Sequence, residues 1–165
     1  MGRKLRVAIT DAEYESHEIE ERVLSRINAE LVKFQCGTED EVIRHCSDAD
    51  GLLNQYAPIT RKVMENLKNV KVIARYGVGV DNLDTKAATE KGIFIANVIY
   101  DITDVADHTV GLILSLIRKI PWIHGATRIG EWDWRKFQPI PRLKGKTVGI
   151  IGFGRIGRKV AQRLK

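Results

Sequence analysis

Three glycines near the end of the sequence have the spacing of a phosphate-binding turn. Gly152, Gly154 and Gly157 form the pattern G-x-G-x-x-G, between an apolar run over residues 147–151 that predicts a strand and a stretch that predicts a helix. In that setting the first glycine permits a tight turn, the second lets the backbone approach a pyrophosphate, and the third allows close helix–strand packing. The helix N-terminus would then offer N–H groups to the phosphates. The pattern predicts a dinucleotide site, with a glycine-rich turn that binds no ligand as the alternative.

A second glycine-rich stretch has the composition of an anion-binding loop. Gly77 and Gly79 flank Val78 directly after an apolar run that ends near Arg75. Successive small residues at the end of a strand can turn several backbone N–H groups toward an anion, and a carboxylate suits such a site. Arg75 would either pair with a substrate carboxylate or carry a solvated charge, and the sequence leaves both open.

Groups for acid–base chemistry are few in this sequence. Asp81 and Asp84 precede a predicted helix, so we expect them to cap it rather than to transfer protons. His108 lies near the start of another predicted helix, where we expect a structural hydrogen bond. No Ser-His-Asp spacing, metal-binding cluster or pair of catalytic carboxylates stands out.

The elements that must position these residues alternate between strand and helix. Apolar runs and helical periodicities follow one another five times with short connections, which predicts an α/β fold with a parallel sheet covered by helices on both faces. The strands are expected over residues 5–10, 30–35, 49–55, 70–77 and 93–98. Because such sheets bind ligands at the carboxyl ends of their strands, the loops at residues 54–58, 76–84 and 97–101 are the candidate site.

The pattern changes after residue 102. Residues 103–132 predict a long helical stretch that breaks before Pro121, with Thr103 as the expected N-cap, and the proline-containing stretch that follows reads as a linker. We therefore expect a substrate domain over residues 1–102, and over residues 103–165 crossing helices, a linker and the start of a Rossmann domain.

Charge and cysteine content narrow the class of protein. Residues 118–165 carry 13 Lys and Arg against 2 Asp and Glu, but they lack a repeated pattern of base-stacking aromatics, so nucleic-acid binding is not expected. No stretch is apolar enough for a membrane helix, and no signal peptide is apparent. Cys36 and Cys46, the only cysteines, are expected to pack as small apolar groups in a reduced, cytoplasmic protein.

Four stretches taken together resemble the NAD-dependent D-2-hydroxyacid dehydrogenase family, which includes phosphoglycerate dehydrogenase, glyoxylate reductase and the C-terminal-binding-protein corepressors. They are "VKVIARYGVGVDNLDTKAATEKGIFIANV", "VADHTVGLILSLIRKI", "GEWDW" and "LKGKTVGIIGFGRIGRKVAQRLK". The resemblance implies a flavodoxin-like substrate domain, a helix that crosses into a Rossmann domain, and a homodimer formed through that helix and the Rossmann unit.

The resemblance also implies roles for individual residues. Val78 and Gly79 would offer N–H groups to the carboxylate of a small 2-hydroxy or 2-keto acid, with Val78 also near the nicotinamide. The loop over residues 54–56, with Gln55 and Tyr56, would face the substrate pocket across the cleft. Arg75 is added as a substrate-binding candidate from its own position after the apolar run, not from the resemblance. The residues expected to contact the cofactor, which would be NAD with NADP left open, are Val78, Thr109, Gly152, Gly154, Arg155, Ile156 and Gly157.

The catalytic Arg, Glu and His of the family would all lie beyond Lys165. The resemblance therefore predicts the N-terminal fragment of an oxidoreductase, catalytically incomplete by itself. Two alternatives stay open: an NAD-responsive, corepressor-like module that binds peptides, and a free-standing domain that binds small carboxylates.

Overall fold

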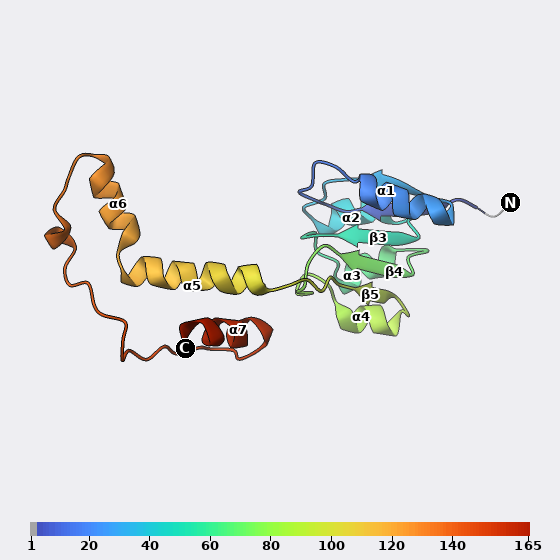
Figure 1. Ribbon diagram of the computed structural model, residues 1–165. Helices are drawn as coiled ribbons and strands as arrows, with labels where there is room; N and C mark the ends of the chain where they lie inside the picture. The colour runs from blue at the N-terminus through green and yellow to red at the C-terminus, as the bar shows by residue number, and fades with distance from the viewer. Residues whose placement is uncertain (1–2) are drawn as a thin grey trace. The chain divides into compact units, whose positions relative to one another are not determined.

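The computed structural model describes residues 3–165 and divides the chain into two units, one ending at Tyr100 and the other formed by Asp101–Lys165. The first unit contains a five-stranded, all-parallel sheet in the order β2-β1-β3-β4-β5, the order of flavodoxin-like folds. The strands are β1 Leu5–Ile9, β2 Ala29–Lys33, β3 Gly51–Asn54, β4 Val72–Arg75 and β5 Phe94–Ala96. The predicted α/β fold is confirmed (Figure 1).

One face of the sheet is covered by three helices, α2 Glu39–Cys46, α3 Arg61–Asn66 and α4 Thr85–Glu90. Their buried side chains form a single core with Ala8, Leu52 and Ile73 of the central strands. Both cysteines belong to this core, and burial raises the pKa of the Cys46 thiol to about 12. The cysteines therefore pack as apolar groups, as predicted.

The other face of the sheet is only partly covered. Helix α1 Glu18–Leu24 and the 3₁₀ turn η1 Ser25–Ile27 pack beside β2. A groove next to them is lined by side chains that include Leu5, Val7, Leu24, Ile27, Leu53 and Val72. Apolar strand residues are thus left at the surface of this unit, with Phe94 of β5 being 77% exposed.

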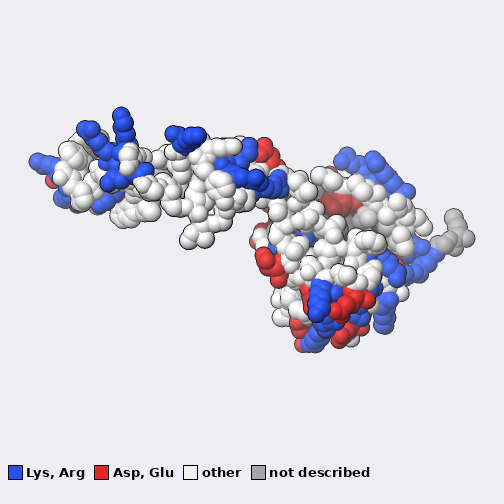
Figure 2. All heavy atoms as spheres, turned by 90° about the horizontal axis from the view of Figure 1, so that it is seen from below, with Lys and Arg blue, Asp and Glu red and all other residues white. Residues whose placement is uncertain are grey.

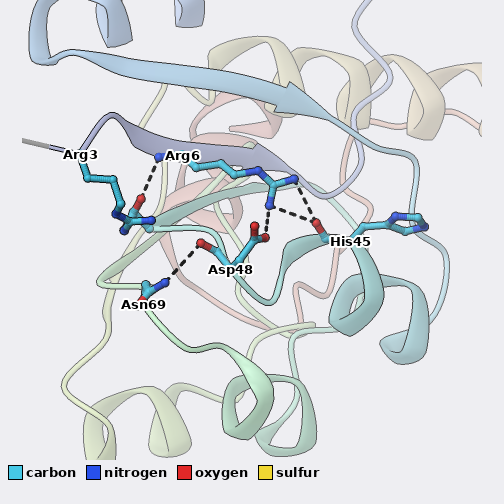
Figure 3. A network of polar contacts seen from close by, with 6 residues as sticks. Arg3, Arg6, His45, Asp48 and Asn69 are labelled. Atoms are coloured by element: carbon cyan, nitrogen blue, oxygen red, sulfur yellow. Dashed lines mark hydrogen bonds and ion pairs between the residues drawn. The ribbon is translucent and has the colours of Figure 1, made fainter.

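A polar network ties together the amino ends of the strands (Figure 3). Asp50, just before β3, accepts the backbone N–H of Arg6 at 2.8 Å and an ion pair from Arg3. Arg6 also pairs with Asp48 and lies over the Phe34 ring. These contacts fasten the first strand to the connection that leads into β3.

Helix starts in the first unit follow their sequence signals. Thr38 and Glu41 form a reciprocal capping box on α2, Thr60 accepts the N–H of Val63, and Asp84 accepts the N–H of Ala87 at 2.8 Å. Asp84 is thus the cap that was predicted, whereas the Asp81 prediction is wrong, because that residue lies too far from the helix start and Asp84 occupies the N-cap.

Protonation of Glu41 should weaken the start of α2. Hydrogen bonds from the backbone N–H of Gly37, then from Thr38, hold the Glu41 pKa below its ordinary value of 4.5. A carboxyl whose pKa is lowered on folding stabilises the protein above its unfolded pKa, and that contribution is lost as the pH falls through the folded pKa. We expect the stability difference between the wild type and Glu41→Gln to shrink on acidification.

Urea unfolding from about pH 6 to about pH 3 measures this difference, over the range in which Glu carboxyls titrate. Glu15→Gln, at an exposed position without such bonds, is the control. A stability difference between the wild type and Glu41→Gln that stays constant over this pH range would contradict the expectation.

The second unit is built from helices. Helix α5 runs over Thr103–Ile117, α6 over Ile120–Arg128 and α7 over Arg155–Leu164, with a 3₁₀ turn η2 at Trp134–Phe137. The predicted break before Pro121 is confirmed: Lys119 adopts a left-handed conformation with φ 55° between α5 and α6. Helix α7 packs on α5, with an ion pair between Arg163 and Asp107.

Two local predictions fail in the second unit. The N-cap of α5 is Ile102, not Thr103, and the Asp101 carboxylate accepts both the N–H and the hydroxyl of Thr103. Residues 147–151 form no strand, because no neighbouring strand is available among the described residues of this unit to pair with them. No helix within residues 3–165 is long and apolar enough to cross a membrane.

Candidate functional site

The loops that follow β3 and β4 meet at the carboxyl edge of the sheet. Asn54 is the register partner of Arg75, and the N–H of Tyr76 donates to the carbonyl of Asn54 at 2.8 Å. The two loops therefore leave the sheet side by side. This geometry brings together the predicted substrate residues of the first unit: Gln55, Tyr56, Arg75, Val78 and Gly79.

Arg75 holds these two loops together. Its Nε donates to the carbonyl of Gln55 at 3.2 Å, and its Nη1 donates to the carbonyl of Gly79. The guanidinium lies against Gly77, where an added Cβ would stand 2.4 Å from Nη1. Glycine at position 77 thus leaves the space that Arg75 fills, and two of the five guanidinium N–H groups of Arg75 donate to the protein itself.

The glycine-rich loop turns its carbonyls toward the protein. The carbonyl of Gly77 accepts the N–H of Val98 at 3.3 Å, that of Val78 accepts the Asn97 side chain at 2.7 Å, and that of Gly79 accepts Arg75. Within the described chain, the N–H groups of Val78 and Gly79 donate to no acceptor. Adjacent N–H groups without partners at a loop tip are suited to an anion such as a carboxylate.

A buried carboxylate that the sequence reasoning missed supports the loop after β3. Asp11 is 3% exposed, and its two oxygens accept the N–H of Gln55 at 3.1 Å and the N–H of Tyr56 at 2.6 Å. The Thr10 hydroxyl and the Asn54 amide also donate to it. Asp11 directly follows the first predicted strand, at the carboxyl edge of the sheet. This position could have identified it from the sequence as a residue of the site.

Asn54 and Asn82 extend this support across to the second loop. The amide nitrogen of Asn82 donates to the side-chain oxygen of Asn54 at 2.7 Å and to the carbonyl of Ala57 at 3.0 Å. Asn54 in turn donates to the Thr10 hydroxyl at 2.9 Å. A chain of side-chain amides therefore connects the ends of β1 and β3 to the glycine-rich loop.

Glu13 contacts both predicted substrate residues of the β3 loop. The buried Gln55 amide accepts the N–H of Glu13 at 2.8 Å through its oxygen and donates to the Glu13 carboxylate at 3.2 Å through its nitrogen. The Tyr56 hydroxyl lies 3.4 Å from the same carboxylate oxygen. Glu13 thus fixes the orientation of the Gln55 amide and places a negative charge beside Tyr56.

An aromatic pair lies over the same edge of the sheet. The rings of Tyr14 and Tyr76 meet edge to face with centroids 5.4 Å apart. The Tyr76 hydroxyl donates to Glu20 at 2.9 Å, and burial followed by that carboxylate raises the Tyr76 pKa. Tyr76 therefore stays protonated at neutral pH and serves as a donor to α1.

The second unit contains the glycine turn. Gly152 has φ 88°, a conformation that favours glycine, and a Cβ added at Gly157 would stand 2.2 Å from the carbonyl oxygen of Gly152. Gly154 is the N-cap of α7, has no side chain to cap the helix, and faces open space. The turn therefore has the tight bend, the open approach and the close packing that the glycine spacing predicted.

Basic side chains gather beside this turn. Arg155, Arg158, Lys159 and Gln162 of α7 line a hollow together with Asp101 and Ile102. Hydrogen bonds from Thr103, and then the nearby charges of Lys159 and Arg163, lower the pKa of the Asp101 carboxyl. On the face drawn in Figure 2, Lys and Arg outnumber acidic residues on the second unit.

Thr109 lies in the middle of α5. Its hydroxyl donates to the carbonyl of Val105 at 2.7 Å, one helical turn earlier. Thr109 and the glycine turn belong to the same unit, Asp101–Lys165. Among the described residues, no cluster of His, Cys, Asp and Glu is arranged to hold a metal ion.

Comparison with known proteins assigns a family to this arrangement. The pattern of the family described as "D-isomer specific 2-hydroxyacid dehydrogenase, catalytic domain" matches residues 7–162. D-3-phosphoglycerate dehydrogenase of Methanocaldococcus jannaschii is 45% identical over 130 residues, which are 78% of this chain and 25% of the relative. Glyoxylate reductase of Thermofilum pendens is 42% identical over 132 residues, 77% of this chain and 39% of the relative.

A solved structure shares the fold. The NAD-dependent formate dehydrogenase of Staphylococcus aureus, solved in complex with NAD, superposes with a TM-score of 0.80 at 30% identity. The match covers 96% of this chain and 52% of that protein. The chain thus spans about half the length of this protein and less of the two relatives above.

Proposed function

Since the chain belongs to the D-isomer specific 2-hydroxyacid dehydrogenase family, we propose that it forms the N-terminal part of an oxidoreductase. The whole protein would transfer a hydride between NAD(P) and a small D-2-hydroxy or 2-keto acid. The observation that carries this proposal is the pair of N–H groups of Val78 and Gly79, which have no acceptor within the described chain and lie at the carboxyl edge of the sheet. They would bind the substrate carboxylate.

The residues of the glycine turn fit a nicotinamide dinucleotide. The bend at Gly152 and the absence of a side chain at Gly154 leave the first turn of α7 open to a pyrophosphate, and the N-terminal N–H groups of a helix have no intrahelical acceptors. Arg155 and Ile156 would flank the pyrophosphate, and Thr109 and Val78 would lie near the nicotinamide. When bound, the nicotinamide supplies the hydride acceptor or donor.

We propose that residues 1–165 do not catalyse the reaction by themselves. His108 is exposed on α5, and no described carboxylate is hydrogen-bonded to it. Arg75 is bonded to two backbone carbonyls. The acid–base group and the arginine that orients the substrate would come from the remainder of the protein.

We also propose that the whole protein is a cytoplasmic homodimer that uses the second unit. Support for the interface comes from apolar side chains at the surface of this unit, among them Leu112, Leu116, Trp122 and Trp132. Exposed apolar groups of this size are typical of surfaces that other parts of a protein, or another subunit, cover. Two unpaired, buried cysteines support a reduced compartment.

Turnover by the full-length protein tests the proposal. The full-length protein, incubated with NADH or NADPH and a panel of 2-keto acids, should oxidise the nucleotide, whereas the 165-residue chain should not. Nucleotide-dependent binding of a partner protein without turnover would instead support the corepressor-like module. Turnover by the 165-residue chain at the rate of the full-length protein would refute its proposed incompleteness.

A further inference from the structure

We propose that Glu13 is a specificity-determining residue that makes this protein select 2-keto acids whose distal group carries no negative charge. This inference rests on the proposed function, because it takes the loop of Gln55 and Tyr56 to face the part of the substrate beyond its carboxylate. Such a preference would distinguish this protein from relatives such as D-3-phosphoglycerate dehydrogenase, which is named for a phosphorylated substrate.

Acidic side chains predominate in the loops at the carboxyl edge. The loops over residues 10–17, 55–60 and 76–84 contain no Lys or Arg. The acidic residues in them are Asp11, Glu13, Glu15, Asp81 and Asp84. Apart from Arg75, which directly precedes the third loop, the Asp, Glu, Lys and Arg side chains here are acidic, so an anionic distal group that comes close to one of them is repelled.

Glu13 lies directly beside the two residues of the β3 loop. Its carboxylate accepts the Gln55 amide at 3.2 Å and lies 3.4 Å from the Tyr56 hydroxyl. No described cation is paired with it. Glu13 itself is exposed, but the buried Gln55 uses both ends of its amide on it, and these two hydrogen bonds favour a position of the charge beside the substrate-facing loop.

Arg75, at the end of β4, does not neutralise the Glu13 carboxylate. Its Nε and Nη1 donate to the carbonyls of Gln55 and Gly79, and it forms no ion pair with Glu13. These two bonds use two of the five guanidinium N–H groups and tie the side chain to the two loops. The Glu13 charge is therefore not compensated by Arg75.

The exposed groups at the loop of Gln55 and Tyr56 are suited to binding a neutral distal group. The Tyr56 side chain is 60% exposed, so its ring presents apolar surface and its hydroxyl an additional hydrogen-bonding group. A distal hydroxyl could donate to the Glu13 carboxylate, and an apolar group could pack on the ring. A phosphate or a second carboxylate would instead stand within a few ångströms of an uncompensated negative charge, and the two like charges repel each other, the more so where the bound substrate excludes water.

A matched pair of substrates tests this inference in the full-length protein. Hydroxypyruvate and its 3-phosphate ester share the reacting keto acid and differ only in the distal group. We expect kcat/KM to favour hydroxypyruvate by at least tenfold, a ratio that should decrease at high salt because screening weakens repulsion. Glu13→Gln preserves the shape and can still accept the Gln55 amide, and we expect it to reduce the ratio about tenfold, chiefly through the KM of the phosphate ester.

The control is Glu15→Gln, which removes one charge from the same loop at a position that contacts neither Gln55 nor Tyr56, and should leave the ratio within about twofold. A preference for the phosphate ester, or an equal effect of the two substitutions, would overturn the inference while leaving the proposed function intact. Absence of turnover with every 2-keto acid would instead overturn the proposed function.

Discussion

Asp11→Ala is expected to destabilise the first unit by about 2–5 kcal/mol, because it removes the acceptor for several buried donors. The N–H groups of Gln55 and Tyr56 point at the two oxygens of this carboxylate, which is 3% exposed, so water does not replace them easily. Each buried donor left without a partner costs roughly 1–3 kcal/mol. The loop after β3 should therefore loosen as the stability falls.

Urea unfolding of the 165-residue chain, followed by circular dichroism, measures this loss. Asp11→Asn is the matched variant, since it retains the volume and one acceptor oxygen, and it should lose less than Asp11→Ala. Glu15→Ala, at an exposed position of the same loop, should change stability by no more than about 0.5 kcal/mol. A loss below about 1 kcal/mol for Asp11→Ala would mean that the loop is held by other contacts.

Gly157→Ala should weaken nucleotide binding by the full-length protein about 100-fold, equivalent to about 2.7 kcal/mol. The new Cβ would stand 2.2 Å from the carbonyl oxygen of Gly152, and this oxygen belongs to the backbone, which has little freedom to yield. Helix α7 would have to move away from the turn. Since the N–H groups at its start are the proposed pyrophosphate site, the displacement should reach the cofactor directly.

Titration of NADH fluorescence measures this affinity. Gly125→Ala is the control, because Gly125 lies within α6 and a Cβ there meets nothing within 4 Å. Unchanged NADH affinity for Gly157→Ala would show that the close contact between helix and turn does not form the binding site. If Gly157→Ala and Gly125→Ala both lost NADH affinity, the loss could not be attributed to the contact between Gly157 and Gly152.

The sequence was most informative where a local pattern decides the structure. Asp84 caps its helix as predicted, because capping depends on a side chain and N–H groups at most three residues away. The same signal does not fix the exact residue, since the caps expected at Asp81 and Thr103 did not form. The strand expected at residues 147–151 did not form, because a strand needs a neighbour, which sequence periodicity does not supply.

The candidate site was predicted only in part for the same reason. The glycine spacings located both loops, since backbone conformation requires glycine there, as at Gly152. The roles of Asp11 and Glu13 depend on contacts with residues more than 40 positions away, at Gln55 and Tyr56. Nothing in the local sequence of residues 11–13 indicates which strand will lie beside them.

The parallel sheet separates two kinds of polar contact. Because every strand runs in the same direction, the ion pairs of Arg3 and Arg6 with Asp50 and Asp48 gather at the starting edge, while the proposed recognition loops gather at the finishing edge. Substitutions at one edge of the sheet should therefore have little effect on the contacts at the other edge. Since the Arg–Asp pairs fasten β1 to the connection that leads into β3, substitutions there should change the stability of the first unit and leave its choice of substrate unchanged.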